Sequence, residues 1–365
     1  MATEDRYARS AGPIDWAISG TFDTNFRWEY QDGRESLLKL YQKGKDRQWD
    51  ATTRIDWSQD LDPENPEQLP DESIPLFGSK VFERLTDPEK ARLRRHFQSW
   101  QLSQFLHGEQ GALICTAKIV QQVPSMDAKF YAATQVIDEA RHVEAYSKLL
   151  HDKFELAYPI TPTLKRLLDG VLSDSRWDMT YLGMQVLIEG LALAAFAQIR
   201  DQSQNPLAAA VNAYVMQDEA RHVAFGRFAL RDYYPQLTQA ERDEREEFAV
   251  EACYLMRDRF QAEEVWETLG LPVDECAEHM LESGFMVSYR SALFSRIVPV
   301  IKDIGLWGPK IRAGYEKMGI LGYASVDAEA MSREDEQVAA EFDARHAEVM
   351  KVAALGAGKA QAAAR

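Results

Sequence analysis

The pentapeptide Asp-Glu-Ala-Arg-His occurs twice in this 365-residue chain, at residues 138–142 and 218–222. Within each copy the glutamate and the histidine are three residues apart, so on an α-helix both side chains project from one face. A glutamate and a histidine on one helical face can bind the same metal ion. The repeat therefore predicts two helices that each supply a carboxylate and an imidazole to a shared site.

Each copy of the pentapeptide is preceded by a further glutamate at the same distance. Glu109 lies thirty residues before Glu139, and Glu189 lies thirty residues before Glu219. This length lets one helix end, turn and run back antiparallel, so each half of the repeat predicts a helical hairpin. Two such hairpins would surround a common centre with carboxylates and imidazoles. The predicted metal ligands are Glu109, Glu139, His142, Glu189, Glu219 and His222.

The two upstream glutamates lie within apolar stripes. Glu109 shares its helical face with Phe105 and Ala112, and Glu189 is also surrounded by apolar residues at helical spacing. A buried carboxylate is costly unless it is paired, protonated or bound to a cation. Oxygen and nitrogen donors without sulfur favour iron or manganese over structural zinc. We therefore expect two iron ions in the bundle interior, with manganese possible in one or both positions.

The other charged residues of the repeat suit a supporting role around the metal ligands. Asp138 and Asp218 can accept the remaining N–H of a ligand imidazole, which fixes its tautomer and orientation. Arg141 and Arg221 would balance the charge of these aspartates. We therefore expect hydrogen-bonded Asp, His and Arg side chains behind the ligands.

The whole chain predicts an all-α fold. Apolar residues recur every three or four positions in long segments, and runs of alternating β-branched residues with hairpin turns are nearly absent. Helix-start patterns occur at residues 86–89, 124–127 and 237–240. We expect a mostly irregular N-terminal arm over residues 1–80, a helical bundle over 81–270, and further helices over 271–365 that end in a frayed Ala-rich tail.

Charge and hydropathy exclude two classes of partner. The formal net charge of −16 opposes binding to nucleic acid or to anionic membranes, because both require a basic face. The longest uninterrupted apolar stretches, residues 190–197 and 285–287, are too short to cross a bilayer, and the first residues do not resemble a signal peptide. We expect a cytoplasmic protein that binds neither nucleic acid nor membranes.

With these motifs, residues 92–233 resemble the ferritin-like di-iron carboxylate superfamily, a four-helix bundle with a di-metal core. The two Asp-Glu-x-Arg-His motifs and the pair Gly108-Glu109 are most similar to large subunits of bacterial multicomponent monooxygenases and to the ribonucleotide reductase small subunit. The resemblance implies O2 activation at the two metals. It also implies that Glu109, Glu139 and His142 hold one iron and that Glu189, Glu219 and His222 hold the other.

Two positions bear on which reaction the resemblance implies. The monooxygenases usually carry a threonine four residues after the third ligand, where this chain has Leu193. Tyr146 stands four residues after His142, where the reductase subunit carries its radical tyrosine. An aromatic residue at this position also often serves only in core packing, so Tyr146 is a candidate catalytic residue with an open alternative.

The expected function is an O2-activating oxidoreductase, a monooxygenase or oxidase acting on a small organic substrate. Glu109 and Glu189 are its candidate catalytic carboxylates, and the expected wall of its apolar pocket comprises Phe105, Ala112, Leu193 and Phe196. Alternatives are a radical-generating protein like the ribonucleotide reductase small subunit and a ferritin-like iron oxidation or storage protein. Because the sequence has no nucleotide-binding fingerprint or cysteine cluster, we expect a separate reductase or ferredoxin as electron donor. We also expect a homodimer.

Overall fold

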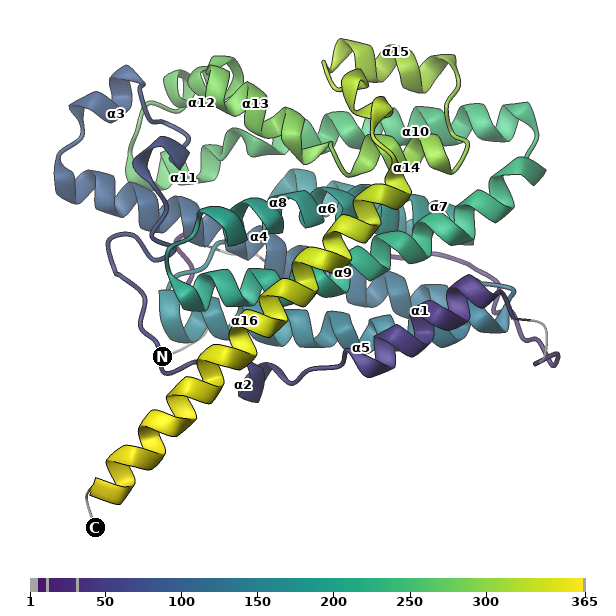
Figure 1. Cartoon of the computed structure of the whole chain (residues 1–365). Coiled ribbons are helices and arrows are strands. Elements are labelled where there is room, and N and C mark those ends of the chain that lie inside the picture. The colour runs from purple at the N-terminus through teal and green to yellow at the C-terminus, as the bar shows by residue number, and fades with distance from the viewer. Residues whose placement is uncertain (1–5, 11–12, 31–32, 364–365) are drawn as a thin grey trace.

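The computed structural model describes residues 6–10, 13–30 and 33–363, except the side chains of residues 285 and 346–363. Over these residues the regular secondary structure of the chain is almost entirely helical (Figure 1). Within the same ranges its β structure is limited to an isolated bridge between Tyr7 and Ala157. The prediction of an all-α fold is confirmed.

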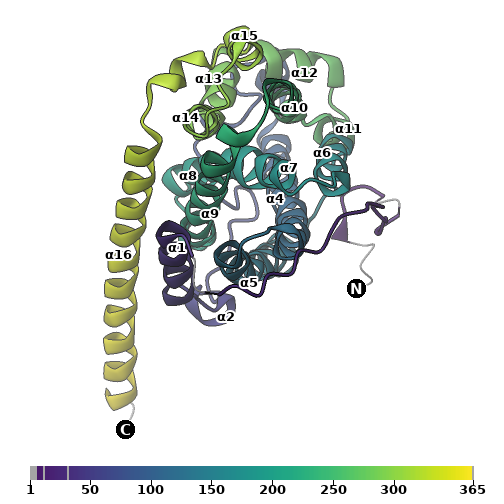
Figure 2. The same ribbon diagram turned by 90° about the vertical axis from the view of Figure 1, so that its right-hand side faces the viewer.

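Four long helical segments form a bundle around the predicted metal ligands (Figures 1 and 2). The first antiparallel pair is α4 (Asp87–Gln122) and α5 (Met126–Lys148). The second pair is α8 (Glu189–Gln202), which continues directly from the π-helical segment η4 (Leu182–Ile188), and α9 (Pro206–Tyr233). Each pair is one of the two helical hairpins expected from the thirty-residue spacing.

Local sequence explains where the bundle helices begin. Thr86 and Glu89 form a capping box at the start of α4, in which the Glu89 carboxylate accepts a 2.8 Å hydrogen bond from the Thr86 N–H. The Asn205 side chain accepts hydrogen bonds from the N–H groups of Leu207 and Ala208 at the start of α9. Thr238 caps the helix that follows the bundle, α10 (Gln239–Asp258). These caps satisfy N–H groups that have no partner within the helix.

One helical stretch, Trp177–Gln202, is long and apolar enough to cross a membrane by length and composition. It comprises α7 (Trp177–Tyr181), η4 and α8, and 83% of its most apolar window is buried inside the protein. The prediction that no apolar stretch reaches this length is wrong, because it counted only uninterrupted apolar residues and this helix includes Gln185 and Glu189. Its central place in the bundle accounts for its composition.

The N-terminal arm contains irregular chain and short helices. Its longest helix is α1 (Glu35–Asp46), which lies against α5 and α9. It is followed by α2 (Ala51–Arg54), η2 (Asp71–Ser73) and α3 (Lys80–Arg84). The irregular chain between α1 and α2 crosses the bundle at the level of the repeated pentapeptide, where its side chains reach the buried aspartates.

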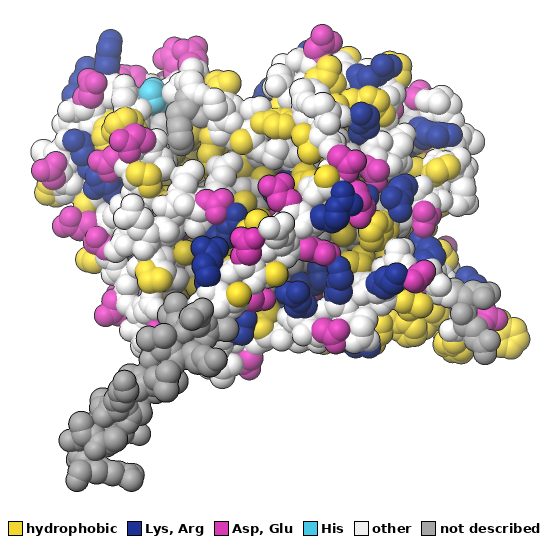
Figure 3. Space-filling view, viewed as in Figure 1, with side chains coloured by type: hydrophobic (Ala, Val, Ile, Leu, Met, Phe, Trp, Pro, Cys, Tyr) yellow, Lys and Arg dark blue, Asp and Glu magenta, His cyan; other side chains and the backbone are white. Residues whose placement is uncertain are grey.

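The C-terminal helices cover one side of the bundle, and the last of them, α16 (Ala328–Ala363), runs diagonally across α9 and beyond it (Figures 1 and 2). Ion pairs such as Lys43–Glu336 and Arg54–Asp343 attach α16 to the arm, and Figure 3 shows acidic and basic side chains side by side on this face. The Ala-rich segment that we expected to fray is helical as far as Ala363, consistent with the high helix propensity of alanine.

The other elements complete the fold. After α5 come η3 (Leu149–Phe154) and α6 (Pro162–Ser173), and η5 (Tyr234–Gln236) follows α9. After α10 come η6 (Arg259–Gln261), α11 (Glu263–Leu269), α12 (Val273–Glu282), α13 (Gly284–Leu293), α14 (Ile297–Asp303), α15 (Pro309–Lys317) and η7 (Leu321–Ser325).

The buried carboxylate of Asp127 ties the arm to the start of α5. Its Oδ2 accepts hydrogen bonds from the backbone N and the Nε of Arg34, at 2.8 and 2.9 Å. Burial alone raises the pKa of Asp127, but hydrogen bonds from Arg34 and Ser125 outweigh burial and lower the pKa below its ordinary value of 3.8. A carboxylate with a lowered pKa stabilises the fold above its unfolded-state pKa and loses that contribution as the pH falls.

We expect Asp127→Asn to lower the free energy of unfolding by about 1–2 kcal/mol at neutral pH, because Arg34 is partly exposed and loses a charged partner. The difference from wild type should shrink below about pH 4, as the Asp127 carboxylate of the wild type takes up a proton. Urea unfolding at several pH values measures both effects. Asp232→Asn removes the half-exposed second partner of Arg34 and should cost less than about 0.5 kcal/mol. An equal cost for Asp232→Asn, or a cost of Asp127→Asn that is independent of pH, would contradict this interpretation.

Candidate metal centre

The structure brings all six predicted ligands together in the middle of the bundle. They form two overlapping groups, in which the nearest ligand atoms lie within 4.8 Å of one another. Every one of the six side chains is buried, and the most exposed of them, Glu109, is 5% exposed. Glu109 comes from α4, Glu139 and His142 from α5, Glu189 from α8, and Glu219 and His222 from α9.

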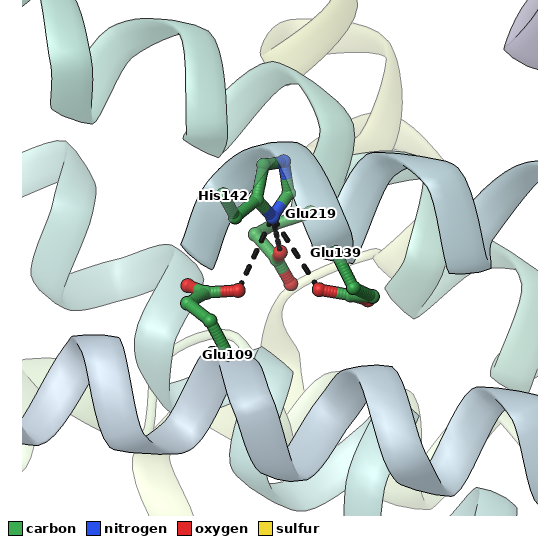
Figure 4. A group of neighbouring side chains, drawn as sticks. All are labelled: Glu109, Glu139, His142 and Glu219. Carbon is green, nitrogen blue, oxygen red and sulfur yellow. Dashed lines mark hydrogen bonds and ion pairs between the residues drawn. The ribbon is translucent and has the colours of Figure 1, made fainter. Parts of the chain in front are cut away.

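The first group surrounds the Nδ1 atom of His142, and Figure 4 shows its side chains pointing toward one another. This nitrogen lies 3.1 Å from Glu109 Oε2 and 3.1 Å from Glu219 Oε1. Glu139 Oε2 is slightly farther away, at 3.4 Å. Three carboxylates and one imidazole from three helices therefore face one point.

The second group surrounds the Nδ1 atom of His222. It lies 3.1 Å from Glu139 Oε1 and 3.4 Å from Glu219 Oε1. Glu189 completes this group with Glu139 and His222. The Gln135 side chain donates hydrogen bonds to both Glu139 and Glu189, at 2.9 and 3.1 Å.

Glu139 and Glu219 lie between the two histidines. The two oxygens of Glu139 face different imidazoles, and Glu219 Oε1 approaches both. The resemblance implied one glutamate pair for each iron, with Glu139 beside His142 and Glu219 beside His222. In the structure each of these two glutamates is shared, which is the arrangement of bridging carboxylates.

Unsatisfied polar atoms test whether these residues suit a metal pair. Glu139 Oε2, Glu189 Oε2, both oxygens of Glu219 and the Nδ1 of His222 are buried without a hydrogen bond to any described residue. Burial, and then the charge of Glu219, raises the pKa of Glu109 to about 8 and that of Glu189 well above its ordinary value. Two divalent cations would offset the crowded negative charge and satisfy these atoms. The donor set therefore fits a di-metal site of iron or manganese.

Asp138 and Asp218 each contact the Nε2 atom of a ligand imidazole, as expected. Each aspartate, however, contacts the histidine of the other copy of the repeat. His142 Nε2 lies 3.0 Å from Asp218 Oδ2, and His222 Nε2 lies 3.3 Å from Asp138 Oδ2. Burial lowers the pKa of His142, but Glu109 and Asp218 outweigh burial and raise that pKa well above its ordinary value. With a proton on Nε2, each imidazole directs Nδ1 at the carboxylates.

The two arginines of the repeat join these aspartates into a buried network of four charges. Arg141 contacts Asp138 at 2.5 Å and Asp218 at 2.8 Å. Arg221 contacts Asp218 and lies 3.7 Å from Asp138. Each aspartate thus meets arginines from both halves, and the network locks α5 to α9 behind the ligands.

The arm contributes two residues to this network that the sequence did not suggest. The Gln48 side chain donates to Asp138 and accepts from Arg141, both at 2.7 Å. The Trp49 Nε1–H donates to Asp218 Oδ2 at 2.8 Å. Neither residue lies in a periodic segment, so no local pattern marks it. The arm therefore supports the centre as well as covering the bundle.

Gly226 allows α9 to approach the segment that carries Glu189. A Cβ atom at this position would lie 2.6 Å from the Cβ of Gln185 in η4. Contacts this short do not occur between real side chains, so a larger residue would push α9 away from η4. Because Gly226 follows His222 by one helical turn, it helps to keep His222 close to Glu189.

Tyr146 is buried one turn beyond His142. Its hydroxyl donates a 3.0 Å hydrogen bond to Asn212 Oδ1. Its ring lies beside Phe105 and Phe196, with ring centroids 6.0 and 5.8 Å away. Burial, and then the charge of Glu109, raises the pKa of Tyr146 well above its ordinary value. The phenol is therefore neutral and oriented by Asn212.

A small cavity of about 30 Å³ lies beside the centre. Glu109, Glu189 and Glu219 contribute to its wall, as do three of the expected wall residues, Phe105, Ala112 and Phe196. Leu193 does not line it and is buried in the core, so this part of the prediction is wrong. The remaining wall residues are Gln104, Gly108, Leu164, Met184, Ile188, Ala192 and Arg259.

Comparison with known proteins gives one family. Residues 30–305 match the family model described as p-aminobenzoate N-oxygenase AurF, and this span includes all six residues of the metal centre. No curated protein matches the chain. Among solved structures, a variant of an R2-like ligand-binding oxidase with an anaerobically reconstituted Mn/Fe cofactor is 18% identical, with 77% of this chain and 95% of that chain covered and a TM-score of 0.42. The ribonucleotide reductase homodimer from Saccharomyces cerevisiae is 14% identical, with coverage of 78% and 83% and a TM-score of 0.49.

Proposed function

Because the chain belongs to the family of the p-aminobenzoate N-oxygenase AurF, we propose that it uses O2 to oxygenate the nitrogen of a small aromatic amine. More broadly, the chain is a di-metal, O2-activating oxidoreductase. The observation that supports the proposal most is the buried cluster of four carboxylates and two imidazoles beside an apolar cavity. In a purely structural bundle, so many buried carboxylate oxygens and imidazole nitrogens without hydrogen bonds would destabilise the fold.

We assign distinct roles to the residues of the centre. Glu139 and Glu219 would bridge the two metals, while Glu109 and Glu189 would each bind one. When bound, iron, or manganese in one or both positions, supplies the binding and reduction of O2. The carboxylates balance the cations, and Asp138 and Asp218 hold the imidazoles in place.

The wall of the cavity supports an aromatic substrate. Phe105 and Phe196 lie with ring centroids 4.8 Å apart in an edge-to-face arrangement, and Met184 and Ile188 extend the apolar surface. Such a wall packs against an aromatic ring and excludes water from the carboxylates. Because the cavity reaches Glu109 and Glu189, a ring in it would place its amine next to the metal positions.

The test is a single-turnover reaction of the reduced, iron-loaded protein with ¹⁸O2 and p-aminobenzoate as the probe. We expect a hydroxylamine product that carries one ¹⁸O atom by mass spectrometry, with the other oxygen atom released as water. O2 consumption without a labelled product would contradict N-oxygenation. A lasting tyrosyl signal by electron paramagnetic resonance, absent in Tyr146→Phe, would support the radical alternative instead.

We also propose a separate electron donor. The three cysteines, Cys115, Cys253 and Cys276, are each buried and free, so they offer no redox centre of their own.

We further propose that the protein is a homodimer. On the outer side of α4 and α5, Ile114 and Ile137 are 49% and 57% exposed. A second copy of this chain would cover these two exposed apolar side chains. Sedimentation equilibrium should give twice the chain mass, and Ile137→Glu should shift it toward the monomer. A monomeric wild type would contradict the dimer.

A further inference from the structure

Glu67 is a buried carboxylic acid in the N-terminal arm, outside the metal centre. It is 0% exposed, and neither of its carboxyl oxygens has a hydrogen bond to any described residue. Burying a polar group without a partner is costly, and burying an unpaired charge costs more. Burial raises the pKa of Glu67 to about 8, so the side chain keeps its proton at neutral pH. The arm therefore carries a neutral acid into the protein interior.

The bundle holds the backbone of Glu67 in this position. Its N–H donates a 3.0 Å hydrogen bond to Gln98 Oε1 in α4, and the Ser203 hydroxyl at the end of α8 donates to its backbone oxygen at 2.6 Å. The next residue, Gln68, has a φ of 50°, in the left-handed region that residues other than glycine rarely adopt. A strained residue and an unpaired buried acid both reduce stability, and such features persist mainly where a function requires them.

Two phenols lie near the Glu67 carboxyl group, the buried Tyr146 of α5 and the half-buried Tyr289 of α13. Burial raises the pKa of both phenols, and a negative charge on Glu67 raises it further. The Tyr289 hydroxyl accepts a 3.1 Å hydrogen bond from Gln101, which lies about one turn after Gln98 on α4. The pKa of Glu67 itself responds to burial alone. Within the described residues, these phenols are therefore its titratable neighbours, and no charged side chain acts on it.

Tyr146 connects the surroundings of Glu67 with those of the metal centre. Its ring lies beside Phe105 and Phe196, and both of these residues line the cavity that Glu109 also lines. Besides burial, the charges of Glu109 and Glu67 both raise the pKa of Tyr146. Tyr146 is therefore a neighbour of the buried acid of the arm and of the carboxylates of the centre.

A groove of about 40 Å³ lies beside the segment that carries Glu67. Its wall includes Leu69, Gln101 and Gln202, each within three residues of Glu67 or of a residue that holds the Glu67 backbone. Tyr289 also lines the groove, and Gln202 is exposed to solvent. A volume of this size holds a few water molecules. Water can therefore come close to Glu67, although the carboxyl group itself is buried.

We propose that Glu67 carries protons to the metal centre, from water in this groove through the hydroxyl of Tyr146. Conversion of an amine to a hydroxylamine consumes one O2, two electrons and two protons, and it releases one water molecule. The electrons come from the separate donor, but the protons must enter a centre whose six ligands are all buried. The inference rests on the proposed function, because that reaction consumes the protons.

Each proton moves in two linked steps. The Glu67 O–H bond breaks as its proton passes to the Tyr146 oxygen, while the Tyr146 O–H proton passes toward the centre and ends in the released water. For this step the Tyr146 hydroxyl turns away from Asn212, which otherwise accepts its hydrogen bond. Glu67 then recovers a proton from water in the groove. An acid with a pKa of about 8 keeps a proton at neutral pH and still gives it up readily.

The first measurement shows whether Glu67 is a neutral acid in the iron-loaded protein. Glu67→Gln keeps the size and neutrality of the side chain but has no acidic proton to give. The infrared spectrum of iron-loaded, O2-free wild type, minus that of the variant, should contain the carbonyl band of a carboxylic acid at neutral pH. This band should disappear as the pH rises through about 8. A band that is absent at neutral pH would overturn the proposal.

The second measurement is the rate of a single turnover of the reduced, iron-loaded protein with O2 and p-aminobenzoate. We expect Glu67→Gln to retain its iron but to form hydroxylamine at least about tenfold more slowly. Its solvent deuterium isotope effect should exceed that of wild type, because proton delivery then limits the rate. Glu67→Asp, which can still carry a proton, should recover part of the rate. Tyr146→Phe should also be slow, and its combination with Glu67→Gln no slower, because both residues serve one path.

Glu264→Gln is the matched control. Burial raises the pKa of Glu264 as well, but this residue lines neither the groove nor the cavity, so the variant should react as wild type does. The proton path is wrong if Glu67→Gln reacts at the wild-type rate, if Glu264→Gln is slowed equally, or if the double variant is slower than either single variant.

Failure of the proposed function gives a different result. O2 uptake by wild type without hydroxylamine would refute N-oxygenation alone. Glu67→Gln should then slow O2 uptake, which also consumes protons, and an unchanged uptake rate would refute the proton path. A loaded wild type that takes up no O2 would refute both.

Discussion

Glu139→Ala is expected to leave the protein with almost no bound iron, whereas Glu109→Ala should leave one ion per chain. The reason is geometric, because the two oxygens of Glu139 face both imidazoles while Glu109 faces only His142. Loss of a shared ligand weakens both positions, and loss of a terminal ligand weakens one. Metal analysis after anaerobic loading with ferrous iron measures the iron content of both variants.

Glu144→Ala is the control for this comparison. Glu144 lies on the same helix as Glu139, is exposed to solvent and takes no part in the cluster. This variant should retain two ions per chain. If Glu139→Ala and Glu109→Ala retain equal amounts of iron, Glu139 does not bridge.

A second large effect is expected from Asp218→Asn, which should lower the free energy of unfolding by about 3–5 kcal/mol. Asp218 is 1% exposed and is shared by Arg141, Arg221, His142 and Trp49. Removing its charge leaves two buried guanidinium groups with one aspartate between them. Urea unfolding of the metal-free protein measures the loss without the contribution of metal binding.

Two further variants show whether the unpaired arginine causes this loss. Asp218→Asn combined with Arg221→Gln should recover part of the stability, because it removes a charge that would otherwise be buried without a partner. Asp201→Asn removes the charge of an exposed aspartate that pairs with Arg200 and should cost less than about 0.5 kcal/mol. A cost below about 1 kcal/mol for Asp218→Asn would contradict the account of the network.

The repeated pentapeptide and its upstream glutamates made the centre of the bundle predictable. Their side chains are related by helical spacing within one hairpin, which sequence alone can express. Gln135 was predictable by the same rule, since it lies one turn before Glu139 on the same face. The contact between His142 of one hairpin and Asp218 of the other was not predictable, because it depends on how the two hairpins pack against each other.

Other parts of the site have no signal near the repeat. Gln48 and Trp49 belong to irregular chain, and Arg259 follows a helix outside the bundle. Leu193 shows a limit of the spacing rule itself. Ala192 and Leu193 lie on opposite sides of the line that runs along α8 through Glu189, and the cavity lies on the side of Ala192. Spacing identifies a face of a helix but not which edge of that face a cavity occupies.

We conclude that this chain holds two metal ions between two helical hairpins. The most direct test of this conclusion is the iron content of the wild-type protein after anaerobic loading with ferrous iron and removal of unbound metal. We expect two iron ions per chain. A content of one ion or none per chain in folded protein would contradict it.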